Sequence, residues 1–106
     1  MRILHVEDNR TDVDLVARTM QRTSPDSVIE VAGSLEEARD LLQNPKRFNA
    51  ILVDLMLPDG SGLELLNEIR ERQLPLAVVM LTGSGDQKSA IAALQSGADD
   101  YVPKDI

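Results

Sequence analysis

The sequence predicts a doubly wound α/β domain built on a five-stranded parallel sheet. Five short apolar runs, dense in Val, Ile and Leu, recur along the 106 residues without alternating with polar residues. That pattern is typical of strands covered on both faces. Four segments with helical periodicity lie between the runs, so strands and helices alternate along the chain. The length favours one domain, and the sequence contains no internal repeat or low-complexity tract.

The expected strands are four to six residues long, apart from a shorter fifth one. They are Ile3–Val6, Val28–Ala32, Ala50–Leu55, Ala77–Leu81 and Tyr101–Val102. Because a helix follows each of the first four, their connections should be right-handed crossovers.

The expected helices each place apolar residues on one side, three or four positions apart. Two of them open with a capping box, SLEE at Ser34 and SGLE at Ser61, and the fourth should stop at Gly97. The ranges are Thr11–Met20, Ser34–Leu42, Ser61–Arg70 and Asp86–Ser96. The residues expected to face inward are Val13, Val16, Ala17 and Met20, then Leu35, Ala38, Leu41 and Leu42, then Leu63, Leu66 and Ile69, and finally Ala90, Ile91 and Leu94.

Composition narrows the classes of partner. A formal net charge of -7 disfavours direct binding of nucleic acid, which requires clustered Lys and Arg, and it suits a cation or a basic partner. The absence of cysteine excludes disulfides and thiolate zinc sites. No segment approaches the ~18 apolar residues of a membrane span. We therefore expect a cytoplasmic protein that binds neither nucleic acid nor membrane.

Polar side chains collect where the expected strands end. Glu7 and Asp8 follow the first strand, Asp54 lies at the end of the third, Thr82 follows the fourth and Lys104 follows the fifth. In an open α/β sheet, ligands bind outside the carboxyl ends of the strands. These five residues are therefore the candidate functional site.

The chemistry of this set points to a metal ion and a phosphoryl group. Two carboxylates ~4 Å apart repel by about 4 kcal/mol at an effective dielectric constant of ~20, so three of them must take up protons or hold a cation. Oxygen ligands without His or Cys favour a hard ion such as Mg²⁺. With the ammonium of Lys104 and the hydroxyl of Thr82, the site suits a phosphoryl group, whose transfer depends on positioning and charge neutralisation.

Four motifs at these strand ends resemble those of one family. VEDN at 6–9, LVDLMLPDGSG at 52–62, MLTG at 80–83 and GADDYVPK at 97–104 are similar to the receiver domain of two-component response regulators. The resemblance covers the whole chain, and its specificity comes from four motifs in the right order. It implies a flavodoxin-like fold with the strand order 2-1-3-4-5.

The resemblance also implies a phosphoacceptor and a metal site. Asp54 would accept a phosphoryl group from a phosphohistidine on a histidine kinase or a histidine phosphotransfer protein. Glu7, Asp8, Asp54 and the backbone carbonyl of Met56 would bind Mg²⁺ or Mn²⁺.

Further roles implied by the resemblance concern the phosphoryl group and the loops around it. Lys104 and Thr82 would each contact a phosphoryl oxygen, and Tyr101 would turn inward when Thr82 moves. Gly83 would leave room for the phosphoryl group. The loop after the acceptor strand would be shaped by Pro58, Asp59 and Gly60.

The function implied is a phosphorelay switch that changes the surface around the fourth helix and the fifth strand. Such a domain catalyses its own phosphorylation and dephosphorylation but is not an enzyme in the turnover sense. Two alternatives are an adaptor that works without phosphorylation and a Mg²⁺-dependent phosphohydrolase of the haloacid dehalogenase type.

Single residues of the site also have simpler interpretations. Glu7 and Asp8 would cap the first helix, Thr82 would cap the fourth, and Tyr101 would be a surface residue. His5 is interpreted as structural.

Two features depart from the family pattern. Asp105 follows Lys104, where many relatives have a proline preceded by a cis peptide bond, and a cis bond before a non-proline residue costs ~3 kcal/mol. The sequence also stops two residues after Lys104, without the fifth helix. We therefore expect 1–106 to be a C-terminally truncated receiver domain from a longer protein, whose uncovered apolar surface associates with a second copy.

Overall fold

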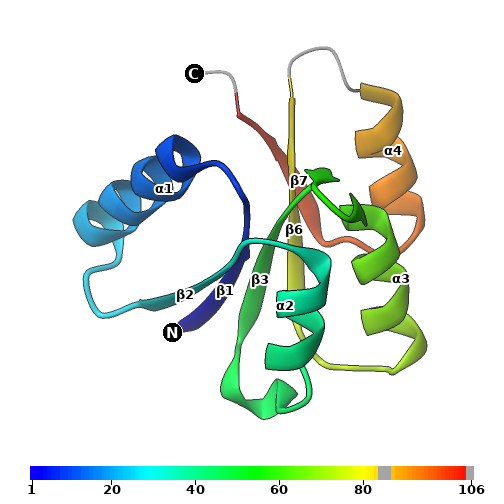
Figure 1. The fold of residues 1–106 in the computed structure, drawn as a ribbon, viewed down its shortest axis with the longest axis horizontal. Helices are drawn as coiled ribbons and strands as arrows, with labels where there is room; N and C mark the ends of the chain where they lie inside the picture. The colour runs from blue at the N-terminus through cyan, green and yellow to red at the C-terminus, as the bar shows by residue number, and fades with distance from the viewer. Residues whose placement is uncertain (84–86, 105–106) are drawn as a thin grey trace.

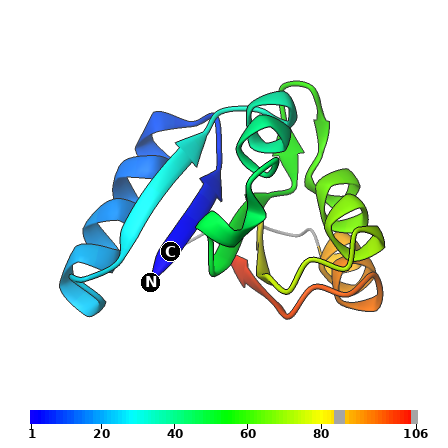
Figure 2. The same ribbon diagram turned by 90° about the horizontal axis from the view of Figure 1, so that it is seen from below.

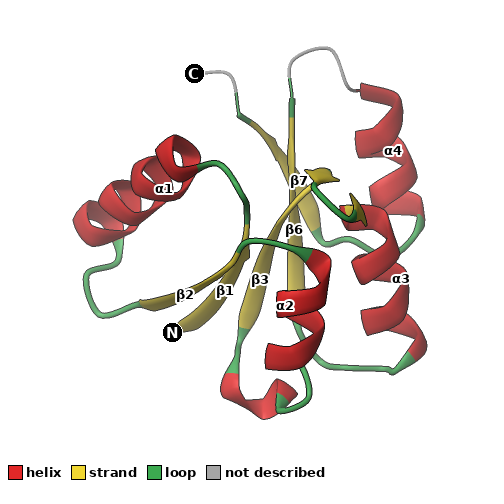
Figure 3. Ribbon diagram, in the orientation of Figure 1, coloured by secondary structure: helices red, strands yellow, loops and turns green. Residues whose placement is uncertain are grey.

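A five-stranded parallel sheet forms the centre of the protein (Figure 3). The structure is a computed structural model that describes residues 1–83 and 87–104. The strands lie in the order β2-β1-β3-β6-β7, which confirms the predicted order 2-1-3-4-5. They are β1 (Arg2–Val6), β2 (Val28–Ala32), β3 (Ala50–Asp54), β6 (Ala77–Thr82) and β7 (Asp100–Pro103).

The register of the sheet brings the carboxyl ends of the strands together. Val6 of β1 pairs with Val53 of β3, and Asp54 pairs with Leu81 of β6. Thr82, the last residue of β6, pairs with Pro103 of β7. Residues that follow β1, β3, β6 and β7 therefore meet at one edge.

The helices form two layers around the sheet. Among the described helices, α1 lies on one face of the sheet, and α2, α3 and α4 lie on the other (Figures 1 and 2). Their bounds are α1 (Arg10–Thr23), α2 (Leu35–Leu41), α3 (Gly62–Glu71) and α4 (Gln87–Gln95), and a short 3₁₀ turn covers Pro45–Arg47. The expected helix start at Asp86 lies outside the described residues.

The hydrophobic core lies between the sheet and the layer of α2, α3 and α4. Strand and helix residues contribute to it together, because alternate residues of a strand and every third or fourth residue of a helix point to the same side. Its fully buried members include Leu4, Val6, Leu35, Ile51, Val53, Leu66, Ile69 and Met80. Burying a side chain of this kind contributes about 1.5–3 kcal/mol.

Two of the predicted apolar faces hold only in part. On α1, Val13, Val16 and Met20 are half-buried and Ala17 is exposed, because α1 faces a part of the sheet that no other described helix covers. On α4, Ile91 and Leu94 are exposed, whereas Ala90 and Ala93 are buried. The predicted stop of α4 at Gly97 is supported: Gly97 has φ +106, and Ala98 N–H donates to the Ala93 carbonyl at 2.9 Å.

The structure contains a two-stranded hairpin after β3 that was not predicted from the sequence. β4 (Met56–Leu57) and β5 (Gly60–Ser61) pair antiparallel and lead directly into α3. Ser61 and Glu64 form the predicted capping box at the start of α3. In α2 only half of the predicted box forms, because the Glu37 carboxylate accepts from Gly33 N–H instead of Ser34 N–H.

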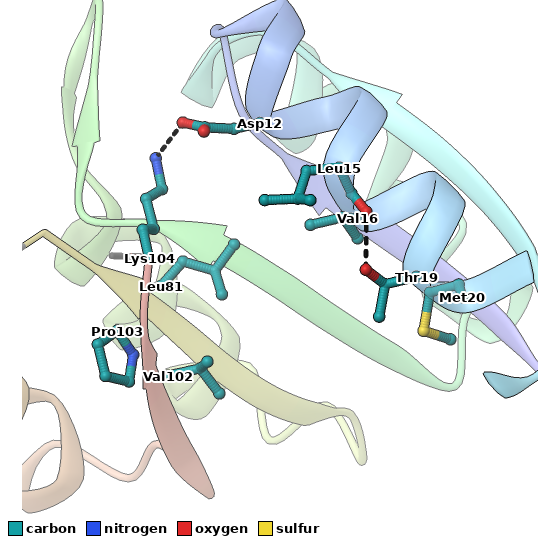
Figure 4. Close-up of a pocket in the computed structure, with 9 residues that line it drawn as sticks. All are labelled: Asp12, Leu15, Val16, Thr19, Met20, Leu81, Val102, Pro103 and Lys104. Atoms are coloured by element: carbon teal, nitrogen blue, oxygen red, sulfur yellow. Dashed lines mark hydrogen bonds and ion pairs between the residues drawn. The ribbon is translucent and has the colours of Figure 1, made fainter. Parts of the chain in front are cut away.

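An apolar groove remains beside α1. It has a volume of about 190 Å³ and lies between α1 and β7 (Figure 4). Its walls include Leu15, Val16 and Met20 on one side and Leu81 and Val102 on the other. The predicted association with a second copy concerns this face and stays a prediction. Among the described helices, none combines the length and the apolar character needed to cross a membrane.

Candidate functional site

The predicted site residues meet at the carboxyl edge of the sheet. Glu7 directly follows β1, Asp54 is the last residue of β3 and Thr82 is the last of β6. All three are buried, with 2%, 7% and 3% of their surface exposed. Lys104 follows β7 and is anchored to β6, because its N–H donates to the Thr82 carbonyl at 2.8 Å. Burial of polar groups at this edge requires that they find partners.

Three carboxylates form a compact cluster at this edge. One oxygen each of Glu7, Asp8 and Asp54 lies within 4.8 Å of the other two. Glu7 and Asp54 are buried, while Asp8 is exposed to solvent. Hard oxygen donors at this spacing, open to solvent on one side, fit a divalent ion such as Mg²⁺ that keeps some of its water. The fit rests on the three carboxylates, and ligation by the Met56 carbonyl stays a prediction.

Lys104 supplies positive charge next to this cluster. Its Nζ lies 2.9 Å from Asp54 Oδ2 and 2.7 Å from Glu7 Oε1. A third carboxylate, Asp12 on α1, places Oδ2 at 2.9 Å from the same Nζ. The contacts with Asp54 and Asp12 are hydrogen bonds, whereas Glu7 Oε1 forms an ion pair without a hydrogen bond among the described residues.

The charges at this edge shift the pKa values of two groups. Burial raises the pKa of Glu7 to about 7, because desolvation disfavours its charged form and the neighbouring Asp54 adds repulsion, while Lys104 opposes the shift. Burial disfavours the charge on Lys104, but Glu7, Asp54 and Asp12 outweigh it and raise the lysine's pKa above its ordinary value. Lys104 is therefore a fixed cation, and Glu7 changes charge near neutral pH.

Close packing behind Asp54 fixes where its side chain emerges. Gly62, the first residue of α3, lies so near that a Cβ there would collide with the Asp54 carbonyl oxygen and with Val53. Gly62 N–H donates to the Leu55 carbonyl at 2.9 Å, which holds α3 against the end of β3. Met56 N–H donates to Asp54 Oδ1 at the long distance of 3.4 Å.

The helix cap at this edge is Asn9. Its side chain accepts from Thr11 N–H and Asp12 N–H at 2.9 and 3.2 Å. The simpler interpretation in which Glu7 and Asp8 cap the first helix is therefore wrong. Glu7 instead accepts from Asn9 N–H at 3.3 Å, which turns its carboxylate toward the cluster.

Asp12 is the residue of this site that sequence reasoning missed. It occupies the first turn of α1, four positions after Asp8. An acidic residue in a first helical turn is usually explained by the helix dipole, so the pattern gave no reason to connect it with Lys104. The only available signal was its position on the turn that follows two carboxylates at a strand end.

The residues predicted to sense phosphorylation, Thr82 and Tyr101, lie on the neighbouring strands β6 and β7. Tyr101 on β7 is 38% exposed, so its ring is not enclosed in this structure. A Cβ at Gly83 would meet no atom of the described residues within 4 Å. The predicted movements of Thr82 and Tyr101 stay predictions. The Lys104–Asp105 peptide bond lies outside the described residues.

The loop after the acceptor strand is held by Asp59. Its carboxylate accepts from Leu35 N–H and Glu36 N–H at 2.8 and 3.0 Å, so it caps α2 from a distant part of the chain. These backbone hydrogen bonds lower the pKa of Asp59. Gly60 adopts φ +150 in the same turn, a conformation that favours glycine, and Pro58 precedes both residues.

His5 on β1 is fully buried, two residues before Glu7. Neither ring nitrogen has a hydrogen-bond partner among the described residues. Burial, together with the charge of Lys104, lowers the pKa of His5 and favours the neutral ring. A buried neutral imidazole fits the structural interpretation.

Comparison with known proteins identifies relatives of one kind. The family model described as the response regulator receiver domain matches residues 3–106. The photosynthetic apparatus regulatory protein RegA of Rhodobacter capsulatus is 34% identical over 96% of this chain and 54% of its own length. The response regulator protein PilR of Pseudomonas aeruginosa is 36% identical over 95% of this chain and 22% of its own. The chain thus spans about half or less of these relatives.

Solved structures share the fold over nearly the whole chain. The Mn²⁺-bound form of the response regulator Rcp1 is 32% identical, with a TM-score of 0.86, and the match covers 97% of this chain and 80% of that one. A response regulator from Burkholderia pseudomallei with a phosphorylated aspartic acid and a calcium ion is 30% identical, with a TM-score of 0.83, over 99% of this chain and 60% of that one. The chain belongs to the family of response regulator receiver domains.

Proposed function

We propose that this receiver domain accepts a phosphoryl group on Asp54 from a phosphohistidine of a histidine kinase or a histidine phosphotransfer protein. The observation that carries the proposal is the position of Asp54, which lies both in the carboxylate cluster and 2.9 Å from Lys104 Nζ. The Asp54 carboxylate is thus a nucleophile that lies between the proposed metal ion and the ammonium of Lys104. Negative charge that develops on the phosphoryl oxygens during its attack would be stabilised by these positive groups.

The proposed transfer exchanges one phosphorus bond for another. An Asp54 carboxylate oxygen attacks the phosphorus atom and forms the new P–O bond. The P–N bond to the histidine breaks, and its electron pair stays on the imidazole nitrogen. In this proposal Lys104 donates to one phosphoryl oxygen, and the hydroxyl of Thr82, which is buried at the end of β6, donates to another.

Glu7, Asp8 and Asp54 would hold the metal ion in this proposal. A bound Mg²⁺ or Mn²⁺ would neutralise the charge that develops on the phosphoryl oxygens. The relatives support this assignment, because the neighbour Rcp1 was solved with Mn²⁺ and the Burkholderia pseudomallei neighbour with calcium and a phosphorylated aspartic acid. The net charge of -7 also favours attraction of a cation over attraction of nucleic acid.

The phosphorylated state would alter the surface around α4 and β7. Thr82 and Tyr101 lie on adjacent strands, and Tyr101 pairs with Met80 in the sheet, so a shift at Thr82 can be transmitted to the exposed face of β7. We propose that the domain is a non-enzymatic cytoplasmic switch within a longer protein. A difference of a few kcal/mol between two conformations is sufficient for such a switch.

Intact mass spectrometry tests the proposal directly. The chain is incubated with acetyl phosphate in the presence of Mg²⁺, and the same reaction is run with a chelator and with Asp54→Asn. We expect the unaltered chain to gain the mass of one phosphoryl group only when Mg²⁺ is present. Asp54→Asn, which keeps the size of the side chain but removes the nucleophilic oxygen anion, should gain none.

Asp14→Asn is the matched control, because Asp14 lies exposed on α1 and loses the same charge. It should be phosphorylated like the unaltered chain. Uptake by Asp54→Asn would refute the assignment of the acceptor. No uptake by the unaltered chain, together with no Mg²⁺ binding, would favour an adaptor that works without phosphorylation.

A further inference from the structure

Asp12 joins α1 to the end of β7 through Lys104. Its Oδ2 lies 2.9 Å from Lys104 Nζ, although the two residues are 92 positions apart in the sequence (Figure 4). None of the residues of α1 is fully buried, so this ion pair is a specific link between the helix and the sheet edge. The ammonium that should meet the phosphoryl group is therefore already shared by three carboxylates.

The three partners of Lys104 differ in how easily they can be released. The Glu7 side chain is 0% exposed and that of Asp54 is 10% exposed, whereas that of Asp12 is 32% exposed. A carboxylate that returns to water loses little when an ion pair opens, but one left buried without its partner is strongly destabilised. Asp12 is thus the partner that Lys104 can exchange with the smallest loss of free energy.

An incoming phosphoryl group competes for this ammonium. Lys104 Nζ donates hydrogen bonds to Asp12 and Asp54 and lies 2.7 Å from Glu7 Oε1, so a phosphoryl oxygen that binds it must compete with three carboxylates. Asp12 also adds negative charge beside the place where an anionic phosphoryl donor must arrive, and like charges at a few ångströms repel.

We propose that Asp12 is a positioning residue: it holds the Lys104 ammonium in the unphosphorylated state and withdraws on phosphorylation, so that a Lys104 N–H donates to the phosphoryl group instead. The proposal rests on the proposed function of Asp54 and deepens it. The Asp12–Lys104 ion pair would therefore lower the rate at which Asp54 is phosphorylated. Opening this pair on phosphorylation also frees the polar end of the groove between α1 and β7.

The test is the initial rate of phosphorylation by acetyl phosphate at saturating Mg²⁺, measured by intact mass spectrometry. Asp12→Asn should react about three- to tenfold faster than the unaltered chain, which is the scale of a half-exposed ion pair. Asp12→Glu, which keeps the charge, should restore the original rate. Asp14→Asn, which removes the same charge from the exposed side of the same helix, should leave the rate unchanged.

A double-mutant cycle separates positioning of Lys104 from general repulsion. In a Lys104→Gln background, which reacts slowly and needs longer incubation, Asp12→Asn should no longer accelerate the reaction. An Asp12→Asn chain that is folded by circular dichroism but reacts no faster would overturn the inference, as would an acceleration that persists with Lys104→Gln. Failure of the unaltered chain to react at all would refute the proposed function of Asp54, and this inference with it.

Discussion

Lys104 Nζ lies 2.9 Å from Asp54 Oδ2, although fifty positions separate the two residues in the sequence. The parallel order of the sheet explains their meeting, because β6 pairs with both β3 and β7. Lys104 N–H donates to the Thr82 carbonyl at the end of β6, which places the ammonium above the carboxyl edge. The proposed phosphoryl chemistry depends on this relationship.

Replacing Lys104 should separate metal binding from phosphorylation. Lys104→Gln removes a donor to the phosphoryl oxygens, so the rate of phosphorylation should fall by roughly a hundredfold. Affinity for Mg²⁺ should rise, because a positive charge next to the carboxylates is lost. Calorimetry and intact mass measure the two effects. Lys88→Gln, an equal charge change on exposed α4, should alter neither, and loss of Mg²⁺ affinity in Lys104→Gln would contradict the account.

Stability without metal should fall as pH rises toward neutrality because of Glu7. Its pKa is about 7 in the folded chain against an ordinary 4.5, so the folded state binds more protons in this interval. The stabilising contribution is complete below about pH 4.5 and is lost as pH rises through about 7. Urea unfolding at several pH values in a chelator measures it. Glu7→Gln should flatten this part of the profile, and Glu36→Gln, on the exposed side of α2, should not.

Mg²⁺ affinity should rise through the same pH range. The ion needs the ionised carboxylate of Glu7, so binding should release protons near pH 7, the approximate pKa of this group. Calorimetric titrations in buffers of different ionisation enthalpy measure the number of protons released. An affinity that does not change across neutral pH would exclude Glu7 as a ligand.

Asp59 should have the opposite dependence on pH. Its pKa is lowered by the backbone N–H groups of Leu35 and Glu36, so its stabilising effect is present above its unfolded pKa and is lost as pH falls through the lowered value. Asp59→Asn should therefore reduce stability at neutral pH and weaken the response to acid. Uptake of a phosphoryl group should be unchanged, and its loss would show that Asp59 does more than hold the loop.

Gly62→Ala should damage the site through the backbone. The added Cβ would collide with the Asp54 carbonyl oxygen and with Val53, so α3 must shift. We expect a loss of about 1–3 kcal/mol in unfolding free energy and slower phosphorylation. Gly33→Ala is the control, because its Cβ would lie 3.5 Å from Glu37 Oε2, an ordinary contact. Equal stabilities of the two variants would contradict the packing described for α3.

The sequence predicted the sheet and most of the site because these depend on local patterns. Apolar runs gave the five strands, and polar residues at their ends gave Glu7, Asp54 and Thr82 at one edge. The errors concern long-range packing. Ile91 follows the helical period of α4 but is exposed, and Asp12 reads as a first-turn acid although it binds a lysine 92 residues away. The periodicity of a helix shows which residues share a face, but it does not show whether another part of the chain packs against that face.

The identity of the acceptor is tested most directly by locating the acyl phosphate. The chain is phosphorylated with acetyl phosphate and Mg²⁺, reduced with borohydride, which converts an aspartyl phosphate to homoserine, and digested for peptide mass spectrometry. We expect homoserine at position 54 and at no other aspartate position. Homoserine at Asp8, Asp12 or any other aspartate in place of Asp54 would contradict it.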